Sequence, residues 1–191
     1  YNLFPKSKLD KQIDLYNSYF KKSAYKFEKF KLDHSYNKIK ENKSRVIHDN
    51  ETYICKEINE GDKRVKAEFL HELYFYQNIL GKNQKDTSDK LNNCKLVSYD
   101  ITDYESESKN YAFYTKLKGH SLLDYLNSKS FSFEVFVKIL YKISEKIYEF
   151  QKRCTYFMHN DLYPWNIILD GSDVNIIDFG KSVYMSKDRL L

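Results

Sequence analysis

Two stretches near the end of the chain decide the fold: HNDLYPWN at 159–166 and DFG at 178–180. Between them lie two apolar runs, Ile167 to Leu169 and Val174 to Ile177, joined by Asp170-Gly171, a dipeptide typical of tight β-turns. Aspartate and asparagine in turns often cap helices or close local turns, and a DFG tripeptide occurs by chance in many proteins. Chance poorly explains both stretches in this order around one apolar hairpin. The pattern therefore predicts a functional site carried by a loop and a hairpin.

These two stretches contain the residue types that phosphoryl transfer requires. The reaction needs a carboxylate near the incoming hydroxyl and oxygen ligands that hold Mg²⁺ against the phosphates of ATP. The spacing H-x-D-x-x-x-x-N makes Asp161 the catalytic carboxylate, and Asn166 both a catalytic-loop residue and a metal ligand. Asp178, after the hairpin, is the second expected metal ligand and carries a full charge. For His159 we expect hydrogen bonds to the loop backbone rather than proton transfer.

A lysine in the first half of the chain complements this loop. Lys56 lies in the strand-like run TYICKEI, where a charged side chain is costly unless its ammonium meets an anion, such as the phosphates of ATP. Glu72, on the apolar face of a helix predicted over 64–80, is the expected ion-pair partner that holds Lys56 for ATP binding. Glu68, one turn earlier, is the alternative partner. Without the loop, an exposed strand lysine and a solvated helix glutamate would explain these residues equally well.

Short alternating runs in the first half predict an antiparallel sheet with one helix, the N-lobe of a two-lobed α+β fold. This lobe is expected to span residues 36–117. Its strands are expected at 43–49, 52–58, 94–103 and 110–117.

The second half, residues 118–191, predicts a mostly helical C-lobe, with a short helix at 121–127 and a long one at 132–154. The sequence ends eleven residues after Gly180 (191 − 180), so we expect this lobe to be shortened. Lys116 and Leu117 lie at the junction of the lobes, where we expect the hinge that binds adenine.

The segment before Lys56 lacks one expected feature. Residues 37–53 contain no glycine, so the glycine-rich loop that covers phosphates with backbone amides is not recognisable. Lys43, Ser44 and Arg45 lie where such a loop would fall, and their side chains could contact phosphate instead.

Residues 1–35 predict a basic amphipathic leader helix, because apolar residues recur at helical spacing from Ser7 to about Lys31 with lysines between them. Such a helix can bind an anionic membrane surface. We favour the simpler interpretation, in which it packs on the next domain and leaves its lysines in solvent.

Composition restricts the remaining possibilities. A net charge of +5 spread over interleaved Lys and Glu favours anionic ligands but is not the footprint of a nucleic-acid-binding protein. Three widely spaced cysteines indicate neither a disulfide framework nor a zinc site, and they fit a cytoplasmic protein. No apolar run is long enough to span a membrane.

With these residues assembled, the chain resembles the protein-kinase-like superfamily after about residue 35. It is most similar to bacterial small-molecule and glycan kinases, and among them to the lipopolysaccharide core heptose kinases, in the stretches TYICKEI, FLHELYFYQNIL, YTKLKGHSLLDYL and NIIDFGKSVYMSKDRLL. The resemblance implies an ATP-dependent kinase that phosphorylates a sugar hydroxyl of the lipopolysaccharide inner core at the cytoplasmic face of the inner membrane. The loop HNDLYPWN is also common among choline and aminoglycoside kinases, so the acceptor stays open.

Two other functions are alternatives to this one. A minimal protein Ser/Thr kinase, similar to the small kinase of the tRNA-threonylcarbamoyl complex, would also lack a long activation segment. A pseudokinase or interaction module would explain the missing glycines, although the intact Asp161, Asn166, Asp178 and Lys56 argue against it.

Overall fold

A computed structural model describes most of the chain, which folds into two compact units. Unit 1 comprises residues 1–77 and 95–116, and unit 2 comprises residues 78–94 and 117–191. The described residues are 8–22, 32–42, 44–59, 61–81, 92–101 and 109–186.

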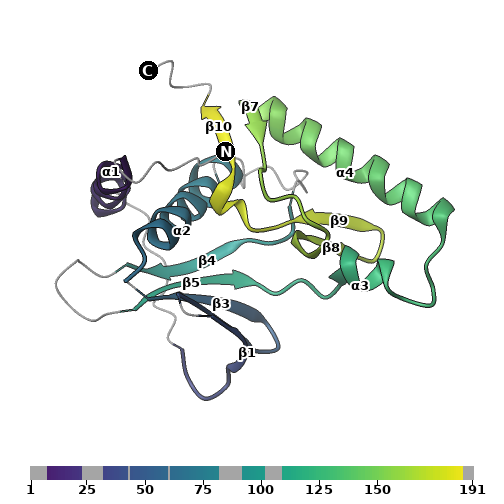
Figure 1. Ribbon diagram of the computed structural model, residues 1–191, viewed down its shortest axis with the longest axis horizontal. Coiled ribbons are helices and arrows are strands. Elements are labelled where there is room, and N and C mark those ends of the chain that lie inside the picture. The colour runs from purple at the N-terminus through teal and green to yellow at the C-terminus, as the bar shows by residue number, and fades with distance from the viewer. Residues whose placement is uncertain are drawn as a thin grey trace. The chain divides into compact units, whose positions relative to one another are not determined.

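Unit 1 is built on a five-stranded antiparallel sheet with the order β1-β2-β3-β5-β4 (Figure 1). Its strands are β1 (Asn37–Glu41), β2 (Arg45–Asp49), β3 (Tyr53–Ile58), β4 (Leu96–Asp100) and β5 (Asn110–Thr115). Strand β3 is central, so Lys56 is held in register between Ile47 on β2 and Ala112 on β5. The α+β class and the antiparallel sheet are thus confirmed, and β1 is a strand that the sequence analysis did not predict.

Helix α2 (Lys63–Phe75) begins where Asp62 accepts hydrogen bonds from the backbone N–H groups of Arg64 and Val65, which satisfies two donors of the first turn. The helix predicted over 64–80 is present, and its last five residues, Tyr76–Leu80, form a π-helical turn instead of continuing as α-helix. There the N–H of Tyr76 is shared between the carbonyls of Glu72 and Leu73. Sequence periodicity does not reveal such a widening.

Helix α1 (Leu9–Lys22) packs on α2 within unit 1. The Tyr16 hydroxyl lies 2.6 Å from Nδ1 of His71. Burial raises the pKa of Tyr16, so its hydroxyl keeps its proton beside the imidazole. The helix buries Leu9 and Ile13, as the packing interpretation requires. Residues 23–31 of the expected leader lie outside the described part of the chain.

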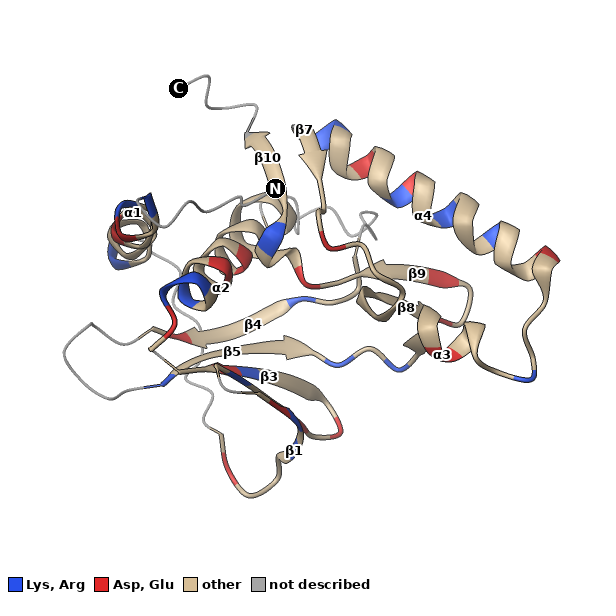
Figure 2. Ribbon diagram, viewed as in Figure 1, with Lys and Arg blue, Asp and Glu red and all other residues tan. Residues whose placement is uncertain are grey.

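The charge of α1 is more balanced than the leader as a whole. Between Leu9 and Lys22 it carries three lysines and two aspartates, a net charge of +1 (3 − 2). Figure 2 shows both signs on α1, α2 and α4.

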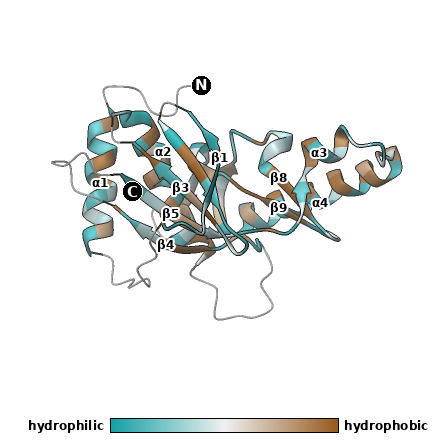
Figure 3. Ribbon diagram, turned by 90° about the horizontal axis from the view of Figure 1, so that it is seen from below, coloured by the Kyte–Doolittle hydropathy of each residue, from teal (hydrophilic) through white to brown (hydrophobic). Residues whose placement is uncertain are grey.

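Unit 2 combines helices with two small sheets, of strand orders β6-β8-β9 and β10-β7. Its helices are α3 (Leu122–Leu126) and α4 (Phe133–Arg153), and its strands are β6 (His120–Ser121), β7 (Cys154–Met158), β8 (Ile167–Asp170), β9 (Asp173–Ile176) and β10 (Val183–Ser186). One core cluster joins α3, α4, β8 and β9, and Figure 3 shows apolar residues along the last three. The cluster consists of Leu122, Tyr125, Ile139, Ile143, Ile167, Leu169 and Val174.

The predicted hairpin is present as β8 and β9, with Ile167 paired to Ile176 and Gly171 at a φ of 60° in the turn. Gly119 is required for a different reason. A Cβ atom there would lie 1.7 Å from the Leu169 carbonyl oxygen, so only glycine lets β6 run beside β8. The sequence did not predict β7 and β10, which pair with each other across a long stretch of chain.

Among the described residues, no helix combines the length and the apolarity needed to cross a bilayer.

Candidate functional site

The loop of residues 159–166 connects β7 to β8 and is fixed by its own hydrogen bonds. The N–H of Tyr163 donates to the Asp161 carbonyl at 2.8 Å, and the N–H of Asn166 donates to the Tyr163 carbonyl at 2.8 Å. The Asn166 side-chain nitrogen donates to the Asp161 carbonyl at 2.8 Å and lies 3.4 Å from its Oδ2. Because Asn166 is buried, its amide fixes the backbone of Asp161 and lies beside its carboxylate.

The hairpin end is tied to the same loop. The Ile177 N–H donates to the Asn166 carbonyl at 3.0 Å, and His159 Nε2 lies 3.0 Å from the Ile177 carbonyl oxygen. A carbonyl can only accept, so Nε2 carries the proton and donates. His159 is buried and its ring packs on Phe179 with centroids 5.1 Å apart. His159 therefore fixes the backbone through a hydrogen bond, as expected from the sequence.

Asp178 has an unusual backbone conformation. Its φ and ψ are both 65°, in the left-handed region, which costs a non-glycine residue about 1 kcal/mol. The following Phe179 is completely buried against Phe150 and Phe157, and the Ser182 hydroxyl donates to its carbonyl at 2.8 Å. This packing maintains the strained residue, and strain of this kind concentrates at functional sites.

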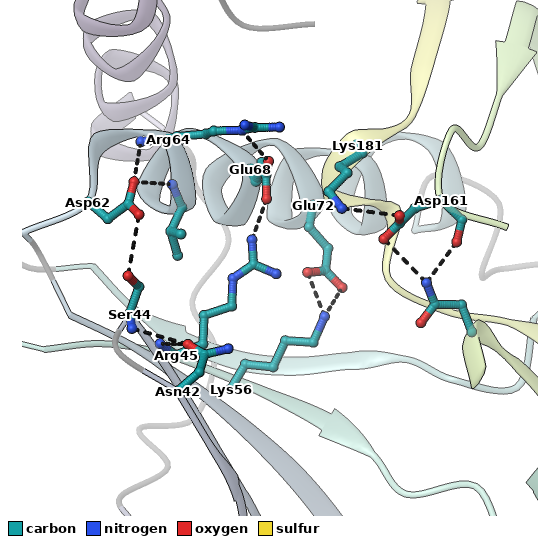
Figure 4. Close-up of polar contacts among 12 residues, drawn as sticks. Asn42, Ser44, Arg45, Lys56, Asp62, Arg64, Glu68, Glu72, Asp161 and Lys181 are labelled. Carbon is teal, nitrogen blue, oxygen red and sulfur yellow. Dashed lines mark hydrogen bonds and ion pairs between the residues drawn. The ribbon is translucent and has the colours of Figure 1, made fainter. Parts of the chain in front are cut away.

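Lys181 is a candidate site residue that the sequence analysis missed. Its ammonium donates to Asp161 Oδ1 at 3.1 Å (Figure 4), and its carbonyl accepts from the Asn160 side chain at 3.3 Å. The side chains of Lys181 and Asp161 are 37% and 14% exposed, so the pair is only partly withdrawn from water. The available signal was its position, immediately after the DFG stretch.

In unit 1, Lys56 pairs with Glu72 and not with Glu68. Its ammonium donates to both Glu72 carboxylate oxygens, at 2.7 and 2.8 Å, and the two side chains are 20% and 4% exposed (Figure 4). Glu68 instead binds Arg45 and, at 3.2 Å, Arg64. The helix therefore presents Glu72 to the sheet and keeps Glu68 in a separate cluster.

The residues suggested for phosphate contact before Lys56 are engaged elsewhere. The Ser44 hydroxyl donates to Asp62 at 3.3 Å, and Arg45 binds Glu68, so both support the start of α2. Lys43 lies outside the described residues.

The expected hinge residues lie at the border of the units, with Lys116 in unit 1 and Leu117 in unit 2. The Lys116 N–H donates to the Thr52 carbonyl at 2.8 Å, and its ammonium binds the Asp49 carboxylate and the Asn50 carbonyl. Its donors thus secure the β2–β3 turn, and adenine binding by Lys116 and Leu117 stays a prediction.

The donor set of unit 2 fits Mg²⁺. Two hydrogen bonds use the amide nitrogen of Asn166, which leaves the amide oxygen as the atom that could ligate a cation, and Asp178 offers a carboxylate. Mg²⁺ in nucleotide sites takes one or two protein oxygens and completes its shell with phosphates and water. Within the described ranges, no cluster of three or more His, Cys, Asp or Glu could hold a metal alone.

The fold of this chain has counterparts among solved structures, although no protein-family model and no curated protein matches the sequence. The chain is similar to the bifunctional kinase-methyltransferase WbdD, with a TM-score of 0.55, 23% identity and coverage of 73% of this chain and 30% of that one. The fold is kinase-like.

Two further WbdD structures show a similar degree of likeness to the chain. A co-crystal structure with the kinase inhibitor LY294002 gives a TM-score of 0.56 at 24% identity, covering 77% of this chain and 33% of that one. The monomeric form gives a TM-score of 0.55 at 24% identity, covering 73% of this chain and 33% of that one. The chain thus spans about a third of the length of these structures, and the likeness does not single out the heptose kinases.

Proposed function

We propose that the protein is an ATP- and Mg²⁺-dependent phosphotransferase that moves the γ-phosphate of ATP to a hydroxyl acceptor. The observation that carries the proposal is the arrangement of unit 2, where one hydrogen-bonded loop holds Asp161 and Asn166 and ties them to the strand end before Asp178. A carboxylate, an amide oxygen and a second carboxylate in this order are the groups that position the nucleophile and the nucleotide in kinases.

In this proposal Asp161 accepts the hydrogen bond of the incoming hydroxyl and orients its oxygen for attack on phosphorus. Lys181 holds the Asp161 carboxylate in position by donating to Oδ1. Asn166 and Asp178 would hold Mg²⁺, which, when bound, neutralises phosphate charge. In unit 1, Lys56, fixed by Glu72, offers a cation to the phosphates of ATP.

The proposed acceptor is a sugar hydroxyl of the lipopolysaccharide core, or another small alcohol. The resemblance in four stretches supports this choice, and the net charge of +5 favours a phosphorylated, anionic acceptor. Because the reaction consumes ATP, we place it in the cytoplasm. Contact with an anionic membrane surface would come from lysines rather than from the apolar side of α1, which packs on α2, and it would weaken with salt.

A calorimetric titration of ATP with and without Mg²⁺, followed by radiolabel transfer from ATP, tests the proposal. We expect Mg²⁺-dependent ATP binding, incorporation into dephosphorylated core oligosaccharide and little incorporation into casein. Transfer to casein alone would establish a protein kinase. Absence of nucleotide binding would overturn the proposal in favour of an interaction module.

A further inference from the structure

The loop that carries Asp161 also carries two exposed aromatic rings. The residues Tyr163 and Trp165 are 51% and 50% exposed, and their rings stack with centroids 4.5 Å apart and planes at 13°. Half-exposed tyrosine and tryptophan side chains present apolar ring area together with a polar group, a combination common in binding sites. Both rings lie within four positions of the catalytic carboxylate.

The backbone fixes these rings relative to Asp161. Tyr163 donates its N–H to the Asp161 carbonyl and accepts from the Asn166 N–H, so the residue between the two functional side chains has both backbone groups engaged. Pro164 opens the 3₁₀ turn Pro164–Asn166 and restricts φ there. A ligand that stacks on this pair would therefore be held at a defined position along the loop.

We propose that the Tyr163–Trp165 pair is the platform on which a sugar ring of the acceptor stacks. The inference rests on the proposed function and assigns its acceptor subsite. A pyranose has an apolar face of C–H groups and a rim of hydroxyls, so one molecule can cover an aromatic ring and present a hydroxyl to a neighbouring carboxylate.

Charge decides between a sugar and the other ligand class that aromatic rings bind, an organic cation. A cation would need uncompensated negative charge beside the rings. The carboxylate of this loop, Asp161, is instead paired with the ammonium of Lys181, and the chain as a whole carries +5. The net positive charge would repel a cation, whereas it does not repel a neutral or anionic sugar.

Trp165 is the only tryptophan of the chain, so its fluorescence reports on the platform without any need for catalysis. Titration with methyl mannopyranoside and methyl heptopyranoside should give a saturable change in emission that Tyr163→Ala weakens. Choline should give none. A response to choline without one to either glycoside would overturn the assignment, and so would no response to any of the three.

Kinetics distinguish a role of the two aromatic rings in acceptor binding from a role in stabilising the loop. Trp165→Ala and Tyr163→Ala should raise KM for the core oligosaccharide about tenfold to a hundredfold, the range seen when a stacking aromatic is removed, with KM for ATP unchanged. Trp165→Phe should recover most of the loss, and Tyr141→Ala, an exposed aromatic on α4, should change nothing. Equal loss of kcat with KM unchanged would show a structural role.

The two proposals fail in different ways. Sugar-dependent emission in a protein that transfers no phosphate would leave the platform standing and defeat the phosphotransferase proposal. Phosphate transfer to sugar with no glycoside-dependent emission would do the reverse.

Discussion

The two lysine–carboxylate pairs of this protein are built differently. Lys56 and Glu72 come from a central strand and a helix, they share two hydrogen bonds, and both are largely buried. Lys181 and Asp161 come from a turn and a loop, they share one longer hydrogen bond, and both retain more exposure. Regular hydrogen-bonded elements hold the first pair, and residues with positive φ flank the second, at Asn160 and Asp178.

Under the proposed function, this difference corresponds to two different roles. A buried, bidentate pair has little freedom, which suits a cation that must stay in one place for every substrate. A single, partly solvated contact can be exchanged at low cost, which suits a carboxylate that must accept a hydrogen bond from an incoming hydroxyl.

Replacing Asp161 is the most direct way to test these roles, and the largest effect is expected there. Asp161→Ala should lower kcat by about 10²–10⁴-fold, the usual contribution of a positioned acid–base group, with ATP affinity retained. Asp161→Asn should be nearly as inactive, because it keeps the shape and loses the charge. Radiolabel transfer and ATP calorimetry measure the two quantities, and a loss of ATP binding would show that the assigned role is wrong.

Asp178→Ala should abolish the Mg²⁺ dependence of ATP binding, because alanine offers no ligand, and turnover should fall with it. Asp173→Ala is a suitable control, since Asp173 is an exposed aspartate on the same hairpin. Calorimetry at several Mg²⁺ concentrations distinguishes the two variants. Unchanged turnover in Asp178→Ala would remove this residue from the site.

The buried pair should give a smaller effect on ATP and a larger one on folding. Lys56→Met should raise KM for ATP and destabilise the protein by about 3 kcal/mol, because it leaves the Glu72 carboxylate buried without its cation. Glu72→Gln should be milder. Glu68→Gln should lower stability without changing KM for ATP, since Glu68 binds Arg45 and Arg64. Lys38→Met, which removes an exposed strand ion pair, is the control in urea unfolding and in kinetics.

The partly solvated pair should behave in the opposite way. Lys181→Met should reduce kcat about tenfold while leaving the unfolding midpoint and KM for ATP near those of the parent, because the contact is exchangeable. Lys181→Arg should restore most of the rate. Lys152→Met, which removes an exposed pair with Glu149 in the same unit, should be silent. A fall in stability equal to that of Lys56→Met would erase the distinction between the pairs.

What the sequence predicted well was local. The hairpin follows from two apolar runs around a turn and is confirmed, whereas the roles proposed for Asp161, Asn166 and Asp178 follow from short spacings and stay predictions. The choice of Glu72 over Glu68 followed from helix periodicity, which sets one face of a helix against a sheet.

What it missed depends on contacts distant in sequence. Strands β7 and β10 exist because they pair with each other, and Lys181 became a candidate site residue because a turn brings it to Asp161, twenty positions away. The π-helical turn at Tyr76–Leu80 likewise leaves no mark on apolar periodicity.

The cysteines allow the local stability of β3 and of β7 to be compared without an activity assay. Cys55 precedes Lys56 on the central strand β3, and Cys154 opens β7, in a two-stranded sheet that leads to the loop of residues 159–166. Both are thiols outside any disulfide, and both are fully buried. Because a two-stranded sheet opens more readily than the middle of a five-stranded one, we expect a thiol reagent to modify Cys154 faster than Cys55. Replacing Cys94 with serine removes the third thiol from the measurement.

The pH dependence shows how the slower thiol reacts. Burial, assisted by the charge of Glu57, raises the pKa of Cys55 to about 12. Reaction within the folded sheet would therefore accelerate with pH up to that value, because only the thiolate reacts. Reaction through local opening would level off near pH 8.5, the ordinary pKa of a free thiol, provided that opening itself does not change with pH. We expect the second profile for both cysteines, with the Cys154 rate higher throughout. Mass-spectrometric labelling at pH 7 to 10 measures it, and a faster Cys55 would mean that β3, with Lys56, is the more mobile region.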